Sequence, residues 1–315
     1  MNILITGGSG YLGGCIYNYF RKRKEFKITI CSSSNVRKIE GFDFVPINWD
    51  KKESIKNVCK NQDIIIHCAS PDARECEKNP DNSNKFNSIT LDFFIKTAIS
   101  SLVKKFIFFS TAHVYRSPLK GIIDEKTPLK PSHPYGISKK IGEQTLLKYK
   151  DVENFELNVI RLSNAFGVPC SKSKKPWDLV VNDFCKQAVV NNTININSDG
   201  KQLRNFVSVK EVCRLLNFMI NLFFKSKKLP IIFNFGGNWT LSIKDLAELV
   251  ANRYEKRYGI KPKTIIKKKL HKKDDLFFSF NYDLIIEQGF KPKNNNLNDV
   301  DELFKFVKAK FINAK

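Results

Sequence analysis

Short apolar runs alternate with amphipathic stretches along the first half of the chain. The runs at residues 64–66 and 106–109 are apolar throughout, which is typical of strands buried on both faces. Strands that alternate with helices predict crossover units and a parallel sheet. We expect strands at residues 3–6, 27–31, 44–47, 63–67, 105–110 and 157–162, and helices at residues 11–22, 51–60, 84–101 and 134–150.

The pattern becomes less regular after Pro169. Ser242, three residues before Asp245, is typical of a capped helix start. We interpret the chain as an α/β protein, with a doubly wound parallel sheet in residues 1–168 and a smaller substrate-binding lobe, interleaved with the sheet, in residues 169–315. In this second part we expect a short strand at residues 231–235 and helices near residues 177–190, 209–225, 242–257 and 298–313.

The composition is that of an ordinary globular protein. Hydrophobic residues make up 42% of the 315 residues and charged residues 27%, which disfavours a disordered chain and a disulfide scaffold. No stretch approaches the roughly 18 consecutive apolar residues that a membrane span needs. Because the chain opens on a short apolar run and a glycine-rich turn, we expect a cytoplasmic protein without a leader segment or a membrane partner.

The net charge of +23 raises the question of a nucleic-acid partner. Only 10 of the 54 basic residues are arginines, and the lysines are spread from Lys22 to Lys315. Base recognition relies on arginine and on a clustered basic face, so we expect no nucleic-acid partner. The eight cysteines form no zinc-binding spacing with the four histidines, so we expect reduced thiols and no metal.

A glycine-rich turn, Thr-Gly-Gly-Ser-Gly-Tyr-Leu-Gly at residues 6–13, lies between the first expected strand and the first expected helix. Strand, turn and helix in this order are the context of a dinucleotide-binding fingerprint. The glycines allow a tight turn and a close approach of the pyrophosphate, and the helix N-terminus supplies amide donors. The residues expected to contact the dinucleotide are Gly7, Gly10, Tyr11 and Leu12.

The end of the second expected strand bears on the choice of nicotinamide cofactor. It has the sequence Cys-Ser-Ser-Ser at residues 31–34, with Arg37 close by and no carboxylate. An acidic residue here would bond the adenosine ribose hydroxyls and repel a 2′-phosphate. Ser32 and Arg37 therefore favour NADP, while NAD stays open if its contacts come from elsewhere in the chain.

Tyr135 and Lys139 are four residues apart on an expected helix and therefore share one face. A phenol is a poor base near neutral pH unless a cation stabilises its phenolate, and Lys139 supplies one that can also bond the nicotinamide ribose. Upstream, an expected strand ends at Ser110 and Thr111. A hydroxyl there can bond the substrate oxygen that Tyr135 deprotonates, so these four residues form the candidate catalytic group.

Together these features resemble the extended branch of the short-chain dehydrogenase/reductase superfamily, which acts on nucleotide-activated sugars. The resemblance implies a Rossmann-type fold, NAD or NADP as cofactor and a nucleoside-diphosphate sugar as substrate. It also implies that Asp50 and Ala69 contact the cofactor and that Asn164 and Arg204 contact the phosphates of the substrate. The segments that carry it are residues 6–13, 67–70, 110–115, 123–125, 133–139, 160–167 and 204–209.

Two departures from the family pattern narrow the expected reaction. In the 4,6-dehydratases, the threonine at the position of Thr111 is followed directly by Asp and Glu, which carry the protons of the elimination. In this chain Thr111 is followed by Ala112 and His113. A dehydratase is therefore disfavoured, and His113 is expected beside the substrate or packed against the strand end. Residues 272–275, Lys-Lys-Asp-Asp, replace the usual Arg-Pro-Gly-Asp, so a second diphosphate-binding arginine is missing or replaced by lysine.

Two reactions stay open. An epimerase would oxidise C4 of the sugar, let the 4-keto sugar rotate and return the hydride to its other face. An NADPH-dependent reductase would reduce a 4-keto sugar that it receives. A non-catalytic, dinucleotide-sensing regulator is disfavoured because Tyr135 and Lys139 are both present. The resemblance also implies a homodimer through the helices expected at residues 84–101 and 134–150.

Overall fold

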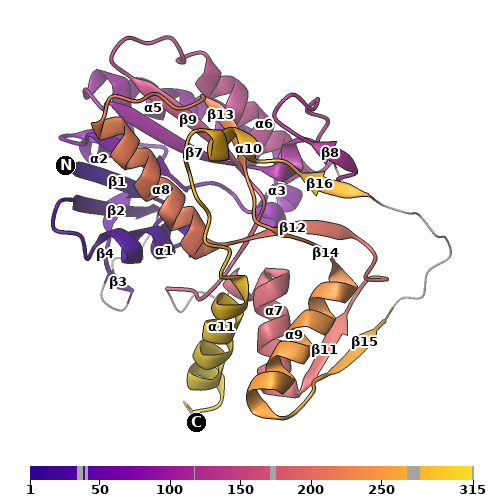
Figure 1. The fold of residues 1–315 in the computed structure, drawn as a ribbon. Helices are drawn as coiled ribbons and strands as arrows, with labels where there is room; N and C mark the ends of the chain where they lie inside the picture. Colours follow the sequence, from indigo (N-terminus) through magenta and orange to yellow (C-terminus); the bar gives the residue numbers. More distant parts are fainter. Residues whose placement is uncertain (34–37, 40–41, 117, 171–174, 268–276, 314–315) are drawn as a thin grey trace.

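Seven parallel strands form the central sheet of the computed structural model (Figure 1). From one edge to the other they are β13 (Ile232–Phe235), β9 (Glu156–Leu162), β7 (Lys105–Thr111), β6 (Ile64–His67), β1 (Asn2–Thr6), β2 (Lys27–Ser33) and β5 (Val45–Ile47). β1 pairs with β2 on one side and with β6 on the other, so the strand order reverses at β1. In doubly wound sheets, ligands bind at the carboxyl ends of the strands beside such a reversal.

The structure describes residues 1–33, 38–39, 42–116, 118–170, 175–267 and 277–313. Arg37 and residues 272–275, which the sequence analysis singled out, lie outside these ranges.

Helices cover both faces of the sheet. They are α1 (Tyr11–Phe20), α2 (Lys52–Cys59), α5 (Leu91–Ser100), α6 (Pro134–Leu147) and α8 (Val209–Phe224). Side chains of consecutive strand residues point to opposite faces, and here both sets are apolar. Ile3 and Ile5 pack with α1 and α8, whereas Leu4 packs with α2, α5 and α6. The expected doubly wound parallel sheet is therefore confirmed.

One expected helix has a different course. In place of a single helix at residues 84–101 the chain forms α4 (Pro80–Lys85), a π-helical turn (Phe86–Thr90) and then α5. α4 begins early because the side chain of Asn79 accepts a hydrogen bond from the N–H of Asn82 at 3.0 Å. A further short helix that we did not expect, α3 (Ala73–Lys78), precedes it and opens with a capping box between Asp72 and Glu75.

A smaller lobe has its own hydrophobic core below the sheet in Figure 1. Its helices are α7 (Val180–Asn191), α9 (Ile243–Tyr258) and α11 (Asn296–Phe311), and its strands are β10 (Asn164–Phe166), β11 (Thr193–Ile196), β12 (Leu203–Ser208), β14 (Trp239–Ser242) and β15 (Lys263–Ile266). The expected cap of α9 is present, because the hydroxyl of Ser242 accepts a hydrogen bond from the N–H of Asp245 at 3.0 Å.

The chain crosses between the central sheet and the smaller lobe more than once. β13 and α8 follow residue 169 in sequence, yet β13 forms an edge of the central sheet and α8 packs against it. β8 (Gly121–Ile123) pairs in parallel with β16 (Phe278–Phe280), which joins segments far apart in the sequence. The remaining elements are β3 (Lys38–Ile39), β4 (Phe42–Asp43), α10 (Asp283–Glu287) and the 3₁₀ turns Ala112–Val114 and Lys175–Asp178.

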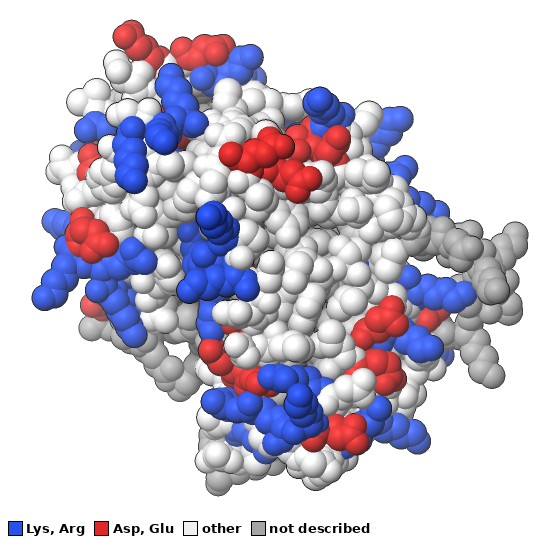
Figure 2. Space-filling view, in the orientation of Figure 1, with Lys and Arg blue, Asp and Glu red and all other residues white. Residues whose placement is uncertain are grey.

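Lysine and arginine side chains are scattered over the face shown in Figure 2, with acidic side chains between them. This distribution on the visible face agrees with the spread of basic residues along the sequence. No helix within the described ranges is long and apolar enough to cross a membrane.

Candidate active site

The turn between β1 and α1, residues 7–10, forms a tight cradle of backbone groups. Gly7 has a φ of +67°, and a Cβ built on it would lie 2.7 Å from the backbone nitrogen of Ala69. A Cβ on Gly13 would lie 2.5 Å from the carbonyl oxygen of Gly7. Within α1 the first backbone donor is the N–H of Gly14, which donates to Gly10 at 3.1 Å, and no side chain caps the helix. The N–H groups of Tyr11, Leu12 and Gly13 have no hydrogen-bond acceptor among the described residues and could therefore bind an anion.

The side chains of the two residues after Gly10 are engaged away from the cradle. The hydroxyl of Tyr11 donates to the carbonyl oxygen of Gly167 at 2.9 Å, and Leu12 packs against the core on the α1 face of the sheet. The backbone N–H of Ala69 donates to the hydroxyl of Thr6 at 3.2 Å, which fixes the chain after β6 beside the cradle. These contacts fit the binding of a dinucleotide along the carboxyl ends of β1 and β6.

A cavity of about 510 Å³ continues from the cradle toward the end of β2. The hydroxyls of Ser9 and Ser32 are 2.6 Å apart, and both residues line this cavity. Asp50 is exposed and is not part of the lining, whereas its neighbour Trp49 is. The sequence analysis missed the contribution of α3, from which Lys78 reaches the lining.

Tyr135 and Lys139 lie on the first turns of α6, as expected. The ring of His133 caps this helix by accepting the N–H of Tyr135 at 3.1 Å. The Nζ of Lys139 donates to the carbonyl oxygen of Phe109 at 2.9 Å and lies 6.0 Å from the centre of the Tyr135 ring. The pair is thus fixed beside the carboxyl end of β7. Ser138, which lies between them in the chain, donates to the carbonyl oxygen of Ser83 in the lining of the cavity, so the pair is next to this candidate cofactor cleft.

Burial changes the proton affinities of both groups. It lowers the pKa of Lys139 to about 8, against the opposing influence of Cys68, Cys76 and Glu143. Lys139 therefore stays mostly protonated at pH 7. Burial also raises the pKa of Tyr135, with smaller contributions from Cys76 and Asp72. The phenol is thus neutral before reaction, and Lys139 is the cation that can stabilise its ionised form.

A buried chain of polar side chains supports this end of the cleft. The hydroxyl of Ser110 donates to Glu143, and the guanidinium of Arg161 holds the same carboxylate with Nη2–Oε2 at 2.7 Å. The Nη1 of Arg161 donates to the hydroxyl of Tyr115 at 3.0 Å, which in turn donates to Asn234 at 2.7 Å. The sequence analysis missed Glu143, although it follows Lys139 by four residues and so lies on the same helix face.

Thr111, the last residue of β7, and His113, two residues further along the chain, have different environments. The hydroxyl of Thr111 accepts the N–H of His113 at 3.2 Å, which leaves its own hydrogen available. The His113 ring centre is 6.5 Å from that of Tyr135. Burial, with smaller contributions from the charges of Arg204 and His133, lowers the pKa of His113 to about 4. His113 is therefore neutral near pH 7.

Asn164 and Arg204 lie on the neighbouring strands β10 and β12 of the smaller lobe. The side-chain amide of Asn164 donates to the carbonyl oxygen of Asn205 at 2.8 Å, which joins β10 to β12. Arg204 donates from Nη2 to Gln202 at 2.9 Å, while its buried Nε has no hydrogen-bond partner among the described residues. Burial lowers the pKa of Arg204. An anionic group at this point would satisfy the arginine.

The fold places the chain among doubly wound α/β proteins that carry a glycine-rich turn after the first strand. The chain belongs to the NAD-dependent epimerase/dehydratase family, whose model matches residues 3–236. A putative UDP-glucose 4-epimerase from Methanocaldococcus jannaschii is 27% identical over 258 residues, which cover 79% of this chain and 81% of the relative.

Two other proteins extend the comparison. A dTDP-D-glucose 4,6-dehydratase from Dictyostelium discoideum is 27% identical over 279 residues, covering 79% of this chain and 61% of that relative, so the match spans less than two thirds of its length. The crystal structure of UDP-glucose 4-epimerase with UDP-glucose from Thermotoga maritima has a TM-score of 0.80 at 22% identity and covers 98% of this chain and 99% of its own. At that identity the likeness shows the fold alone.

Proposed function

We propose that the protein is an NAD(P)-dependent nucleotide-sugar epimerase that acts at C4 of a hexose through a 4-keto intermediate. The observation that carries the proposal is the position of Tyr135 and Lys139 on α6, beside both the end of β7 and the dinucleotide cradle. A dinucleotide bound along Gly7, Gly10 and Ala69 would supply the hydride acceptor and donor. The similarity to a putative UDP-glucose 4-epimerase supports the same assignment.

In this proposal Tyr135 takes the proton of the 4-hydroxyl when C4 is oxidised and returns it when C4 is reduced. The ammonium of Lys139, held by the carbonyl of Phe109, lowers the cost of ionising the phenol. The hydroxyl of Thr111 donates to the same sugar oxygen and orients it. Ser110 acts from behind, because its hydroxyl is already bound to the buried carboxylate of Glu143.

The diphosphate of the substrate would lie between β10 and β12 in this proposal. The unpartnered Nε of Arg204 is a donor for a phosphate oxygen, and Asn164 lies on the adjacent strand. The charge of Arg204 also contributes to lowering the pKa of His113, the residue proposed to contact the sugar. A neutral His113 near Tyr135 then supplies a hydrogen bond to the sugar rather than a proton.

An NADPH-dependent reductase of 4-keto sugars is the second candidate. The hydroxyls of Ser32 and Ser33 and the ammonium of Lys78 line the cavity that continues from the cradle. Glu75 is the one acidic residue of that lining, and its Oε2 accepts the N–H of Asp72 at 2.7 Å within the capping box. These groups suit a 2′-phosphate better than a free ribose hydroxyl, which favours NADP as cofactor.

A 4,6-dehydratase is the less suitable assignment, although five of the similar proteins carry that name. The elimination of water needs an acid and a base beside the sugar. Ala112 offers neither, and His113 is neutral near pH 7 because burial lowers its pKa to about 4. The catalytic region thus retains the groups for hydride transfer at C4 and lacks the adjacent carboxylates for elimination.

The test is the substitution Tyr135→Phe, assayed with UDP-, dTDP- and GDP-glucose by chromatographic separation of the sugar nucleotides. The variant should lose at least about a hundredfold in turnover of the substrate that the wild type converts, with dinucleotide affinity nearly unchanged. Tyr149→Phe is the matched control, because its hydroxyl donates to Asp92 on the outer helices. Full activity of Tyr135→Phe would overturn the catalytic assignment.

The same assay separates the two candidates. An epimerase converts a nucleotide hexose into its C4 epimer without net consumption of dinucleotide. A reductase leaves that hexose unchanged and oxidises NADPH only when a nucleotide 4-keto sugar is supplied.

A further inference from the structure

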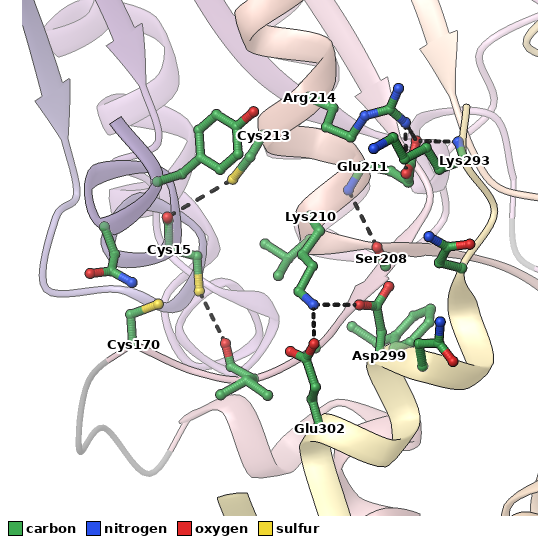
Figure 3. A pocket seen from close by; sticks show the side chains of 18 residues that line it. Cys15, Cys170, Ser208, Lys210, Glu211, Cys213, Arg214, Lys293, Asp299 and Glu302 are labelled. Atoms are coloured by element: carbon green, nitrogen blue, oxygen red, sulfur yellow. Dashed lines mark hydrogen bonds and ion pairs between the residues drawn. The ribbon is translucent and has the colours of Figure 1, made fainter. Parts of the chain in front are cut away.

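A second cavity, of about 660 Å³, lies at the junction of α1, α8 and α11 (Figure 3). It shares no lining residue with the cavity that continues from the cradle. Its inner wall is largely apolar and contains sulfur, whereas its rim carries charged side chains of α8 and α11. The proposed catalytic function uses no residue of this lining.

Three of the eight cysteines line this cavity, and each comes from a different segment. Cys15 lies on α1, Cys213 on α8 and Cys170 on the segment that follows β10. The Sγ of Cys15 donates to the carbonyl oxygen of Val168 at 3.5 Å, and the Sγ of Cys213 lies 3.9 Å from the carbonyl oxygen of Cys15. Cys15 and Cys213 are buried, while Cys170 is partly exposed.

Cys15 and Cys170 face each other. Figure 3 shows their side chains pointing toward one another. The interaction between the two thiols is the largest influence on both: it lowers the pKa of Cys170 and raises that of Cys15. The side chain of Asn18 and the charge of Arg21 lower the pKa of Cys170 further. Cys170 is thus the better thiolate of the pair and also the more accessible one.

We propose that Cys170 and Cys15 form a thiol–disulfide exchange site for low-molecular-weight disulfides of the glutathione class. The thiolate of Cys170 attacks one sulfur of the disulfide, forms a mixed disulfide and releases one thiolate. Cys15 then loses its proton and attacks the Cys170 sulfur, which closes the bond between Cys15 and Cys170 and releases the second thiolate. The protein pair loses two electrons and two protons, and the small disulfide gains them as two thiols.

The cavity suits an anionic peptide disulfide. Its volume gives such a reagent access to Cys170, and Lys293 on its rim makes no ion pair within the described residues. Lys210 lies on the same rim, with its Nζ 3.0 Å from Asp299 and 2.6 Å from Glu302. The ammonium of Lys293 is therefore the rim cation that can meet a glutathione carboxylate without breaking an existing pair.

The bond would join two segments that already contact each other. The hydroxyl of Tyr11 donates to the carbonyl oxygen of Gly167 at 2.9 Å, and Asn182 accepts the N–H of Gly167 at 3.1 Å. Cys170 therefore follows a chain position that is fixed relative to α1. Closing the disulfide links the helix that begins at the dinucleotide cradle to the strand that carries Asn164.

The experiment treats the purified, reduced protein with glutathione disulfide, alkylates the remaining thiols and identifies the products by peptide mass spectrometry. The wild type should form the Cys15–Cys170 disulfide and retain no glutathione. Cys170→Ala should consume glutathione disulfide at least about tenfold more slowly. Cys15→Ala should instead hold glutathione on Cys170, because no second thiol resolves the mixed disulfide.

Cys213→Ala is the matched control, since Cys213 lines the same cavity but takes no part in the exchange; it should react like the wild type. Circular dichroism checks that each variant is folded. If Cys15→Ala does not fold, Cys170→Ala alone tests the proposal, because Cys170 is partly exposed and its substitution should be tolerated. Undiminished reaction of Cys170→Ala, a bond that uses Cys213, or a wild type that does not react would each overturn the proposal.

Discussion

The two ends of the cofactor cleft are built differently. At the catalytic end, the groups behind the proposed Tyr135 base are buried: Glu143 is 1% exposed, and Lys139 and Arg161 are each 4% exposed. At the end proposed for the adenosine, Lys78 is exposed, and the hydroxyl of Ser32 is held by the hydroxyl of Ser9 and the carbonyl oxygen of Ser33. The catalytic end is thus set by the interior of the fold, and the adenosine end by groups in contact with water.

This difference in burial determines which residues the fold needs for stability and which can be exchanged. A buried ionic group needs its partner, because an uncompensated charge in the interior is costly. Exposed groups can be exchanged at little cost in stability, so the choice between NAD and NADP can vary while the reaction chemistry stays the same. Substitutions at the catalytic end should therefore destabilise the fold, whereas substitutions at the adenosine end should change the preference between NAD and NADP.

The largest effect is expected for Glu143→Ala. This removes the carboxylate that accepts Ser110 and the Arg161 guanidinium, and it leaves the guanidinium buried without its ionic partner. We expect a loss of about 3–5 kcal/mol in the free energy of unfolding, measured by urea denaturation. Glu53→Ala is the control, because its exposed pair with Lys56 contributes little. Equal urea midpoints for Glu143→Ala and Glu53→Ala would contradict the expected difference between the buried and the exposed carboxylate.

An intermediate effect concerns acid stability. His67 lies beneath the catalytic end, in a cluster of aromatic rings that includes Trp49 and Phe94. Burial, with a smaller contribution from the charge of Lys139, lowers its pKa to about 3. The unfolded chain has a histidine pKa near 6.5. Between these values the unfolded state binds more protons, so the stability from a neutral His67 is present above about pH 6.5 and is lost as the pH falls.

His67→Asn removes the titration and keeps a polar group near the Thr6 hydroxyl, which lies 2.8 Å from the Nδ1 of His67. Between pH 7 and pH 4 the wild type should lose about 3 kcal/mol more unfolding free energy than the variant. Urea denaturation at a series of pH values measures the difference. Parallel pH profiles for the two proteins would show that His67 titrates normally in the folded state.

The same contrast explains what could be predicted from the sequence. The cradle and the Tyr135–Lys139 pair were predictable, because a strand, a turn and a helix that are adjacent in the chain place these residues by local geometry alone. Apolar runs such as residues 106–109 predicted β7 for the same reason: burial on both faces is visible in the composition of the run.

What was missed depends on contacts between distant segments. β8 and β16 are three-residue strands more than 150 positions apart, and neither has enough length to show a periodicity. The sequence could place Glu143 on the same face of α6 as Lys139, but its partner Arg161 lies on β9, a separate element of the fold. The π-helical turn at Phe86–Thr90 differs from an α-helix by one hydrogen-bond step, which the apolar pattern does not record.

The smallest effect is expected at the adenosine end, for Lys78→Ala. Lys78 is exposed at the end of α3 and shares a cavity with Ser32 and Ser33, so its ammonium can meet a 2′-phosphate while remaining hydrated. A solvent-exposed charge pair is weak, and the expected loss of NADPH affinity is therefore only about two- to fivefold, with NADH affinity unchanged. Fluorescence titration with both dinucleotides at low and high salt measures the change.

Lys60→Ala is the matched control, because Lys60 is also exposed but lies outside that cavity. Salt should narrow the difference between wild type and Lys78→Ala for NADPH, since an exposed pair is screened. If the affinities for NADPH and NADH fall equally, Lys78 contacts a part of the dinucleotide that both share, such as the pyrophosphate. Lys78 would then contribute to binding but not to the discrimination between NADPH and NADH. The hydroxyls at the end of β2 would be the remaining groups that could discriminate.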